Sequence, residues 1–551
     1  MSISKYTIGD YLLDRIAELG ITEMFGVPGD YNLHFLDHVV NHNKLRWIGS
    51  ANELNAGYAA DGYARIRGAA ALLTTYGVGE LSATNAIAGS YAESLPVIHI
   101  VGAPKKSIQE KQLKVHHSLA DGDFQHFLRM ASEVSCAQTD LKVANATWEI
   151  DRVLRTAMLE SKPAYILMAV DVAATPAAPP SAPLPLAEPV SLPDVEKAFA
   201  EAAREFLRGK KTTILADHFV HRLGEMENLR SLVASSGLPT ATLNWGKSLV
   251  DESAANFVGT YIGAASAPGT RHAVEDAEAL ITLGVEFTDN TTAGFTENID
   301  EYRRLDVHKG AAMVGGEPFT PIQLSRAIEI LTDVVSELEL EGMDVDPAEC
   351  ESTKPEPVTD APLSQVVLWQ EVAQAIEGDN IVVADQGTSF FGLSTARLPK
   401  GAMFIGQPQW GSIGYSLPAM FGAGIADPER RPLLLIGDGS AQLTIQELGQ
   451  VIREGLPAVI VLINNDGYTV ERVIHGPEEL YNDIPTWRWQ EALKFFGAKE
   501  EDCLSLVAAT GLELREALQQ AEANPDKLVF IEAKTQKMDS PEVLKKIAER
   551  L

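Results

Sequence analysis

The chain has 551 residues, of which 45% are hydrophobic and 22% are charged, a composition typical of folded globular proteins. This length is more than one hydrophobic core supports and predicts about three to four domains. The formal charge of −31 argues against nucleic acid or an anionic membrane as a partner, because binding to either requires a basic face.

The three cysteines, Cys136, Cys350 and Cys503, are far apart and odd in number, so they match neither a disulfide framework nor a metal cluster. The first twenty residues are amphipathic and carry acidic side chains, unlike a signal or transit peptide. No apolar run reaches membrane-spanning length. We therefore expect a cytoplasmic protein without a membrane partner.

Residues 1–172 alternate short apolar runs with helical patterns, which is typical of a doubly wound α/β domain. The expected strands are 22–27, 45–51, 69–75, 96–101 and 164–170, and the expected helices include 53–67 and 81–91. The proline-rich segment 173–190 predicts an extended linker. We assign residues 1–180 to a first domain.

The same alternation continues through two more blocks, residues 191–345 and 362–551, separated by an acidic, proline-bearing stretch at 342–361. The expected strands are 212–216, 239–243, 279–284 and 304–307 in the middle block, and 380–385, 403–405, 433–437, 458–464 and 528–533 in the last. A short helix is expected at 541–551. The predicted fold is therefore three doubly wound α/β domains with mainly parallel sheets.

Residues 433–465 contain the most informative pattern. An apolar run ends in Gly437-Asp438-Gly439, an amphipathic segment follows, and a second apolar run ends in Asn464-Asn465. Two buried strands around a helix form a βαβ unit, so Asp438 and Asn465 should emerge together at the carboxyl edge of the sheet. The alternative is an ordinary Asp-Gly turn and a solvated asparagine pair.

Carboxylate, amide and carbonyl oxygens at that edge suit Mg²⁺, and the backbone N–H groups of Gly439 and Ser440 at a helix start suit a phosphate. The stretch therefore predicts a binding site for a metal diphosphate.

Other candidate residues have ordinary structural alternatives. Glu53 and Glu471 each begin a helix, where a carboxylate is favoured by the helix dipole alone. Asp30 could cap the helix that follows it. His116 and His117 are adjacent, which predicts one buried and one solvated ring. No third potential ligand lies at the spacing typical of a zinc site, which argues against zinc.

Taken together, the GDG motif, the 24 residues 440–463 and the following NN resemble the thiamine-diphosphate signature of pyruvate-decarboxylase-like enzymes. The resemblance covers nearly the whole chain, including the segments 386–391 and 481–485, and is closest to bacterial branched-chain 2-oxo acid decarboxylases, with indolepyruvate decarboxylases next. It implies thiamine diphosphate and Mg²⁺ as cofactors.

The resemblance also implies residue roles. The implied acid-base set for proton handling is Asp30, Glu53, His116, His117 and Glu471. Glu53 would bond the aminopyrimidine ring of the cofactor, and Asp438, Asn465 and the Gly467 carbonyl would bind the metal. Further implied cofactor contacts are Thr388, Gly411, Ile413, Gly439, Ser440 and Tyr468.

The implied activity is loss of CO₂ from a 2-oxo acid with release of an aldehyde. Residues at the family's substrate-pocket positions are Asn290, Gln386, Phe390, Val470, Ile474, Ile547 and Leu551. Pyruvate-restricted relatives tend to carry a large aromatic at the Asn290 position, so we expect branched or longer substrates. Pyruvate- or indolepyruvate-selective decarboxylation and acetolactate-synthase-like carboligation remain the alternatives.

In this family the site lies between subunits, with the Glu53 region of one chain facing the diphosphate region of another. The resemblance therefore implies a homodimer that pairs into a homotetramer.

Overall fold

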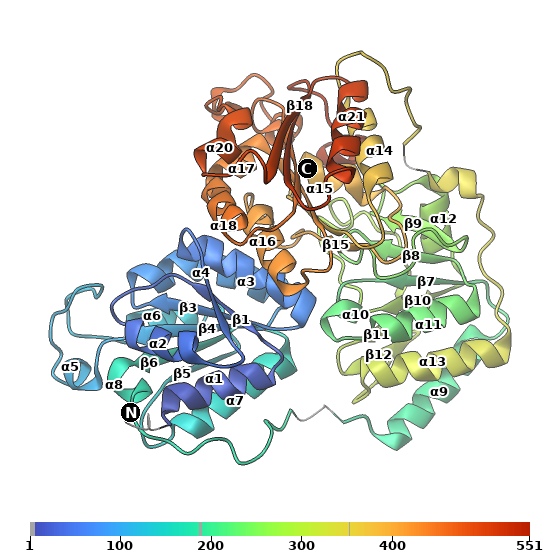
Figure 1. The fold of residues 1–551 in the computed structure, drawn as a ribbon. Helices are drawn as coiled ribbons and strands as arrows, with labels where there is room; N and C mark the ends of the chain where they lie inside the picture. Colours follow the sequence, from blue (N-terminus) through green and yellow to red (C-terminus); the bar gives the residue numbers. More distant parts are fainter. Residues whose placement is uncertain (1–5, 187–189, 352, 551) are drawn as a thin grey trace. The chain divides into compact units, whose positions relative to one another are not determined.

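A computed structural model describes residues 6–186, 190–351 and 353–550, and it contains three sheets flanked by helices (Figure 1). The chain forms two compact units, each built from three segments. The N-terminal unit comprises Met1–Glu188, Tyr415–Pro428 and Thr444–Leu456, and the C-terminal unit comprises Pro189–Gly414, Glu429–Leu443 and Pro457–Leu551. Each predicted domain contains one of the three sheets, which confirms the predicted fold class.

The sheet of the N-terminal unit is fully parallel, with the order β2-β1-β3-β4-β6-β5. Its strands are β1 (Glu23–Gly26), β2 (Arg46–Gly49), β3 (Ala70–Thr75), β4 (Val97–Ala103), β5 (Ala137–Asp140) and β6 (Ala164–Ala169). Its helices are α1 (Ile8–Glu18), α2 (Leu33–Asn41), α3 (Glu53–Arg67), α4 (Val78–Ala92), α5 (Lys106–Glu110), α6 (His126–Ala131), α7 (Ala146–Glu160), α8 (Val170–Ala173) and α16 (Ser416–Ala426). The central strands β3, β4 and β6 are buried along their whole length, which explains their mainly apolar sequences.

Helices α3 and α16 pack with their backbones in close approach. A Cβ atom on Gly62 would lie 2.0 Å from the Ala419 carbonyl oxygen, and one on Gly422 would lie 1.8 Å from that of Ala59. Only glycine permits this spacing, so the small residues of both helices are a packing requirement. This contact holds helix α3, and with it Glu53 at its start, on the sheet.

A buried charge network reinforces α3. The Arg65 guanidinium donates to Asp61 (Nε–Oδ1 2.8 Å) and to Glu93 (Nη2–Oε2 3.2 Å). Asp61 also accepts from Tyr415 Oη at 2.6 Å and from Ser90 Oγ at 2.7 Å. Because all these groups are buried, removing one would leave an uncompensated charge or an unmade hydrogen bond, so they hold α3 in a single register.

Glu80, in the first turn of α4, is a buried carboxyl group with 3% exposure. It accepts from the Gly77 N–H at 2.8 Å and from Tyr165 Oη at 2.6 Å, but burial dominates and raises its pKa to about 7. A folded-state pKa above the unfolded value favours the protonated form. The stability it contributes is therefore present below about pH 4.5 and lost as the pH rises through about 7.

We therefore expect Glu80→Gln to gain stability over the wild type as the pH rises from 5 to 8, by about 1–3 kcal/mol. Thermal unfolding midpoints of both proteins across this range measure the effect. Glu133→Gln, which changes an exposed carboxylate, is the control and should show no such trend. Parallel curves for Glu80→Gln and wild type would contradict the assignment.

The middle sheet has seven strands in the order β13-β12-β11-β10-β7-β8-β9. They are β7 (Thr212–Ala216), β8 (Thr240–Leu243), β9 (Phe257–Tyr261), β10 (Ala279–Leu283), β11 (Arg304–His308), β12 (Ala311–Val314) and β13 (Glu317–Phe319). The first five are parallel. Strand β9 was not predicted, and neither were β12 and β13, the two antiparallel strands at one end of the sheet. These two strands are short and joined by glycine-containing turns, and they carry little alternating pattern.

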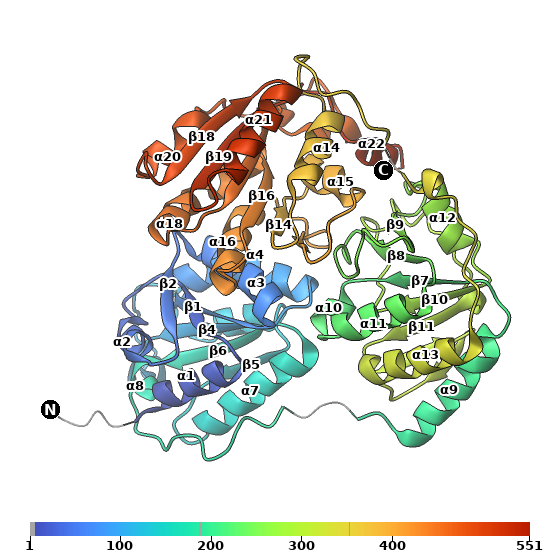
Figure 2. The same cartoon turned by 45° about the vertical axis from the view of Figure 1, so that its right-hand side comes forward.

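Helices cover both faces of the middle sheet (Figure 2). They are α9 (Pro193–Leu207), α10 (Phe219–Arg222), α11 (Met226–Ser236), α12 (Pro268–Glu275) and α13 (Leu324–Leu338). Alternate residues of the strands divide between two apolar clusters. Ile214 and Ile281 pack with α9, α11 and α13, whereas Leu215 and Leu280 pack with α12. Side-chain alternation along each strand thus produces the two-faced sheet.

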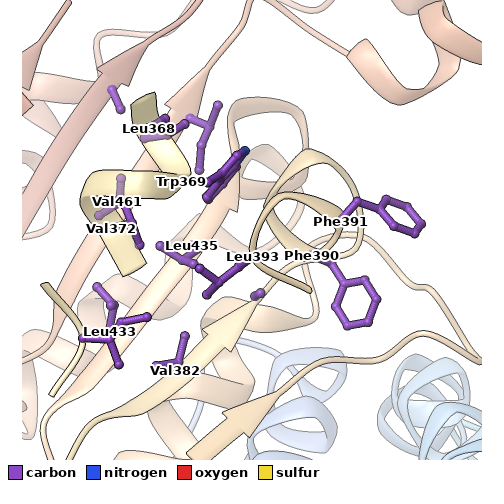
Figure 3. Close-up of a cluster of buried hydrophobic side chains, with 14 of the residues drawn as sticks. Leu368, Trp369, Val372, Val382, Phe390, Phe391, Leu393, Leu433, Leu435 and Val461 are labelled. Atoms are coloured by element: carbon purple, nitrogen blue, oxygen red, sulfur yellow. The ribbon is translucent and has the colours of Figure 1, made fainter. Parts of the chain in front are cut away.

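The third sheet is parallel throughout, with the order β15-β14-β16-β17-β19-β18. Its strands are β14 (Ile381–Ala384), β15 (Met403–Ile405), β16 (Pro432–Gly437), β17 (Val459–Asn464), β18 (Cys503–Ala508) and β19 (Leu528–Lys534). Its helices are α14 (Gln365–Ala375), α15 (Thr388–Ser394), α17 (Asp438–Thr444), α19 (Thr469–Ile474), α20 (Ala492–Phe495), α21 (Gly511–Glu522) and α22 (Glu542–Ala548). Figure 3 shows Trp369 of α14 and Leu393 of α15 near Leu435 of β16, in one buried apolar cluster.

The predicted βαβ unit is present, because β16 and β17 are parallel neighbours. Its connecting segment differs from the single helix we expected. It consists of α17, a short 3₁₀ turn (Ile445–Glu447) and α18 (Leu448–Arg453). The break has a tertiary cause, since the buried Glu447 carboxylate accepts from Asn55 Nδ2 at 2.9 Å and from the Ala51 N–H at 3.2 Å.

All three cysteines are free thiols. Among residues 6–186, 190–351 and 353–550, none of the helices combines the length and the apolar character that crossing a bilayer requires.

Candidate functional site

Glu53 lies at the carboxyl edge of the N-terminal sheet, as the first residue of α3. Asn52 caps the helix by accepting from the Asn55 N–H at 2.9 Å, and no hydrogen bond joins the Glu53 carboxylate to the described part of the chain. A Cβ atom on Gly79 would lie 3.1 Å from Glu53 Oε1 and also 3.1 Å from Thr75 Cγ2. The carboxylate is thus half-buried beside the end of β3 and available to a ligand.

The hydroxyl of Thr75 adds an unused polar atom at this corner. Thr75 Oγ1 is buried and has no hydrogen-bond partner within the described ranges. A Cβ atom on Gly29 would lie 2.5 Å from Thr75 Cβ, so the loop after β1 passes directly over it. Buried hydroxyl groups usually have a hydrogen-bond partner. A bound heteroaromatic ring could supply the partner of Thr75 Oγ1.

Asp30 and the histidine pair meet at the same sheet edge. His116 Nε2 lies 2.6 Å from Asp30 Oδ2, and His117 Nε2 lies 3.7 Å from Asp30 Oδ1. The His116 ring stacks on Tyr31, with centroids 5.0 Å apart and planes 10° from parallel. Gly77 makes room for this loop, since a Cβ atom there would lie 2.0 Å from the His117 carbonyl oxygen.

Both histidines are at least partly exposed, so the expectation of one buried ring is wrong. His116 is exposed and His117 is intermediate. Asp30 supplies the third potential ligand that sequence spacing did not reveal, and the ligating atoms of the three side chains lie within 4.8 Å of one another. An aspartate that contacts two accessible imidazoles suits proton transfer near neutral pH.

In the C-terminal unit, Asp438 follows β16 and Asn465 follows β17, and the two side chains are adjacent. Asp438 is 2% exposed and accepts from the Gly439 N–H at 2.8 Å and the Gly467 N–H at 3.2 Å. Burial raises the pKa of its carboxyl group to about 6. The Asn465 amide nitrogen lies 3.1 Å from Asp438 Oδ1 and 2.9 Å from the Gly467 carbonyl oxygen when it donates to them.

One amide therefore bridges a carboxylate oxygen and a backbone carbonyl oxygen. If the amide is turned, its own oxygen joins them, and three oxygen atoms of different types converge. This donor set fits a hard divalent cation such as Mg²⁺.

The glycines around this edge permit close packing. A Cβ atom on Gly439 would lie 2.6 Å from the Tyr468 ring, so the ring covers the start of α17 beside Ser440. Gly467 has φ +119°, and a Cβ there would lie 2.4 Å from the Asn482 carbonyl oxygen. Buried Arg472 fixes this loop by donating to the carbonyls of Asp466 and Asn482 at 2.8 and 3.0 Å.

Three more predicted cofactor contacts lie in the loops after neighbouring strands. Thr388 begins α15 directly after the β14 loop and is buried. Gly411 has φ +64° and donates to the Gln407 carbonyl at 2.9 Å, and Ile413 follows it with a partly buried side chain. Gly411 is close to Gln386, since a Cβ atom on Gly411 would lie 3.8 Å from Gln386 Cγ.

The predicted substrate-pocket residues have different surroundings. Val470 lies beside the Gln386-Gly387 loop, because a Cβ atom on Gly387 would be 3.6 Å from Val470 Cγ2. Asn290 Nδ2 donates to the Pro408 carbonyl at 2.7 Å. The others are core, surface or undescribed positions: Phe390 and Ile547 are buried in the core, Ile474 is 38% exposed, and Leu551 lies outside the described residues.

Glu471 is on the exposed side of α19, and no hydrogen bond joins its side chain to the described part of the chain. Sequence reasoning missed Thr75, Gly79 and Glu447. Thr75 and Gly79 border Glu53. Glu447 supports the first turn of α3 by accepting a hydrogen bond from Asn55. The sequence Gly77–Ser82 looks like an ordinary turn, and nothing in it signals that Gly79 borders a carboxylate.

The chain matches three family descriptions: the N-terminal TPP binding domain of thiamine pyrophosphate enzymes over residues 6–127, their central domain over 199–315, and their C-terminal TPP binding domain over 387–533. The first and last matches contain Glu53 and the Asp438–Asn465 edge.

Curated relatives cover nearly the full chain. A protein of Mycolicibacterium paratuberculosis named alpha-keto-acid decarboxylase is 51% identical over 542 residues, or 98% of this chain and 95% of the relative. Proteins with the same name from Mycobacterium ulcerans and Mycobacterium tuberculosis are 50% and 51% identical over 539 residues, covering 98% of this chain and 95% and 96% of theirs. The chain belongs to the thiamine-pyrophosphate enzymes and is a thiamine-diphosphate-dependent 2-oxo acid decarboxylase.

Proposed function

We propose that this decarboxylase acts non-oxidatively on 2-oxo acids with branched, longer aliphatic or aromatic side chains, releasing an aldehyde and CO₂, and that it uses Mg²⁺ with thiamine diphosphate. The relatives' names support the reaction class only. The proposals for the metal, the product and the substrate range rest on the residues described above.

The carboxyl edge of the third sheet supports the proposed metal diphosphate site. Asp438, Asn465 and the Gly467 carbonyl would hold Mg²⁺, and the N–H groups at the start of α17 would bind phosphate oxygens. When bound, thiamine diphosphate supplies the electron sink for loss of CO₂. The remaining chemistry is that of the chain's own residues.

Glu53 would hold a proton at the aminopyrimidine ring, since its carboxylate has no other partner in the described chain. Asp30 orients His116 through the 2.6 Å contact, and the pair can deliver or accept a proton at the imidazole. Glu471 is a second accessible carboxylate for the same task. Its place on α19 puts it one residue from Val470, so acid-base and substrate-contact residues share one short helix.

The observation that carries the substrate proposal is the apolar face of α19. Val470 and Ile474 are four residues apart and therefore lie on the same face of the helix. Val470 packs beside Gly387, and Ile474 leaves a large aliphatic side chain 38% exposed. An apolar wall of this kind favours substrates with additional methylene groups, each worth about 1–3 kcal/mol in a pocket.

We therefore expect kcat/KM for 2-oxoisovalerate and phenylpyruvate to exceed that for pyruvate by roughly tenfold or more. Coupled aldehyde assays on the three substrates with thiamine diphosphate and Mg²⁺ measure the ratio. In Ile474→Ala the preference should shrink, whereas Leu480→Ala, which removes an exposed leucine from the following segment, should keep it. A clear pyruvate preference of the wild type would contradict the proposal.

The competing activity is carboligation, which would yield acyloins instead of free aldehyde. Product analysis by gas chromatography distinguishes the two, because one equivalent of aldehyde per CO₂ is expected here.

We also propose a homodimer, paired into a tetramer, on the basis of the family resemblance. Sedimentation velocity of the active enzyme would test it, and a fully active monomer would contradict it.

A further inference from the structure

We propose that Thr469 is a positioning residue whose hydroxyl group sets which atom of the Asn465 amide meets the metal, an inference that rests on the proposed Mg²⁺ site. Thr469 is the first residue of α19 and is 2% exposed. Its backbone N–H donates to the Gly467 carbonyl at 3.0 Å. The residue thus contacts the same loop that carries the proposed metal ligands.

The Thr469 hydroxyl has two competing acceptors. Oγ1 donates to the Lys537 carbonyl at 2.9 Å, and it lies 3.0 Å from the Asn465 amide oxygen when that oxygen accepts from it. A hydroxyl group carries one hydrogen, so it cannot donate to both. Lys537 is held in place, because its Nζ donates to Asp483 Oδ1 at 2.7 Å. The hydrogen therefore has two discrete positions.

Each position of the hydrogen selects one orientation of the amide. With the hydrogen on the Asn465 side, the amide oxygen faces Thr469 and the nitrogen donates to Asp438 Oδ1 and the Gly467 carbonyl, at 3.1 and 2.9 Å. With the hydrogen on the Lys537 side, the hydroxyl presents a lone pair that can accept from the amide nitrogen. The amide oxygen then points to Asp438 and Gly467.

Only the second orientation suits a cation. Three oxygens that converge without a hydrogen between them repel one another unless a positive charge joins them. The first orientation suits the metal-free protein, in which the amide nitrogen occupies the place of the cation. Metal binding would thus turn the amide and move the Thr469 hydrogen toward Lys537.

Removing the hydroxyl favours the metal-free orientation. In Thr469→Val the amide nitrogen keeps two acceptors if it faces Asp438 and Gly467, but has none facing the valine. The cation must then displace two hydrogen bonds without compensation. We expect the variant to bind Mn²⁺ roughly 10- to 100-fold more weakly, in the range typical of residues that orient metal ligands.

The experiment titrates Mn²⁺ into the full chain at saturating thiamine diphosphate and reads free Mn²⁺ by electron paramagnetic resonance. Thr469→Ser retains a hydroxyl and should stay within about threefold of the wild type. Thr260→Val is the matched control, since Thr260 is also buried and its Oγ1 donates to a carbonyl, that of Ser394, at 2.8 Å. It should leave Mn²⁺ affinity unchanged.

The Asn465→Asp variant is a second background, which distinguishes orientation of the amide by Thr469 from general support of the loop by Thr469. In Asn465→Asp both terminal atoms of the side chain are oxygens, so its orientation no longer matters. Adding Thr469→Val to this background should change Mn²⁺ affinity by less than about threefold. A penalty equal to that in the wild-type background would overturn the proposed role, as would wild-type affinity in Thr469→Val alone.

Failure of the proposed metal site and failure of the proposed role of Thr469 give different results. If Asp438→Asn binds Mn²⁺ as tightly as the wild type, the metal site itself is wrong. If Asp438→Asn loses Mn²⁺ while Thr469→Val does not, only the role of Thr469 is wrong.

Discussion

Glu53→Gln is expected to lower kcat for 2-oxo acid decarboxylation by roughly 10²- to 10⁴-fold, the usual contribution of one acid-base group. Glutamine keeps the size of the side chain but cannot exchange a proton with the cofactor ring. Thermal stability should change by only a few tenths of a kcal/mol, because Asn52 already caps α3. Thiamine diphosphate affinity, measured by tryptophan fluorescence, should fall far less than kcat.

Glu149→Gln is the matched control for Glu53→Gln. Glu149 is also a first-turn helix carboxylate of the N-terminal unit, where it pairs with Arg152 at 2.7 Å. The control should retain near-wild-type turnover. If Glu53→Gln also retained it, the ordinary helix-dipole interpretation of Glu53 would be correct.

The second large effect is expected for Asp438→Asn. This change removes the charged member of the proposed metal site and turns an amide N–H toward the N–H of Gly439 or Gly467, both of which now donate to the carboxylate. We expect the Mg²⁺ concentration needed for half-maximal thiamine diphosphate binding to rise roughly 100-fold, because a buried charged contact typically contributes about 2–5 kcal/mol.

Asp466→Asn offers a close comparison for Asp438→Asn. Asp466 is exposed, has φ +59°, a conformation that asparagine also tolerates, and precedes Gly467. The same chemical change one residue from Asn465 should leave Mg²⁺ dependence nearly unchanged. Equal effects of both substitutions would show that general negative charge, rather than the Asp438 ligand, attracts the metal.

Much of the fold could be predicted because its signals are local. Buried parallel strands such as β16 and β17 are apolar up to their last residue, and helix α3 has the bounds that its sequence predicts. Strands β5, β9, β12, β13 and β18, all at or next to a sheet edge, were missed, since such strands are short or mix polar with apolar residues. The break at Ile445 was missed because its cause, the contact of Glu447 with Asn55, joins residues 392 positions apart.

The sequence by itself predicted the site for a metal diphosphate, because consecutive parallel strands place the residues after Gly437 and Ile463 at one edge of the sheet. The reaction class came from the resemblance of its motifs to thiamine-diphosphate decarboxylases. Only the tertiary structure decided which polar groups lie within hydrogen-bond distance of one another. It brought Asp30 to within 2.6 Å of His116 across 86 positions, left Thr75 Oγ1 without a partner in the described chain, and placed the Thr469 hydroxyl between two acceptors. Hydrogen bonding depends on distances of tenths of an ångström, which spacing along the chain does not encode.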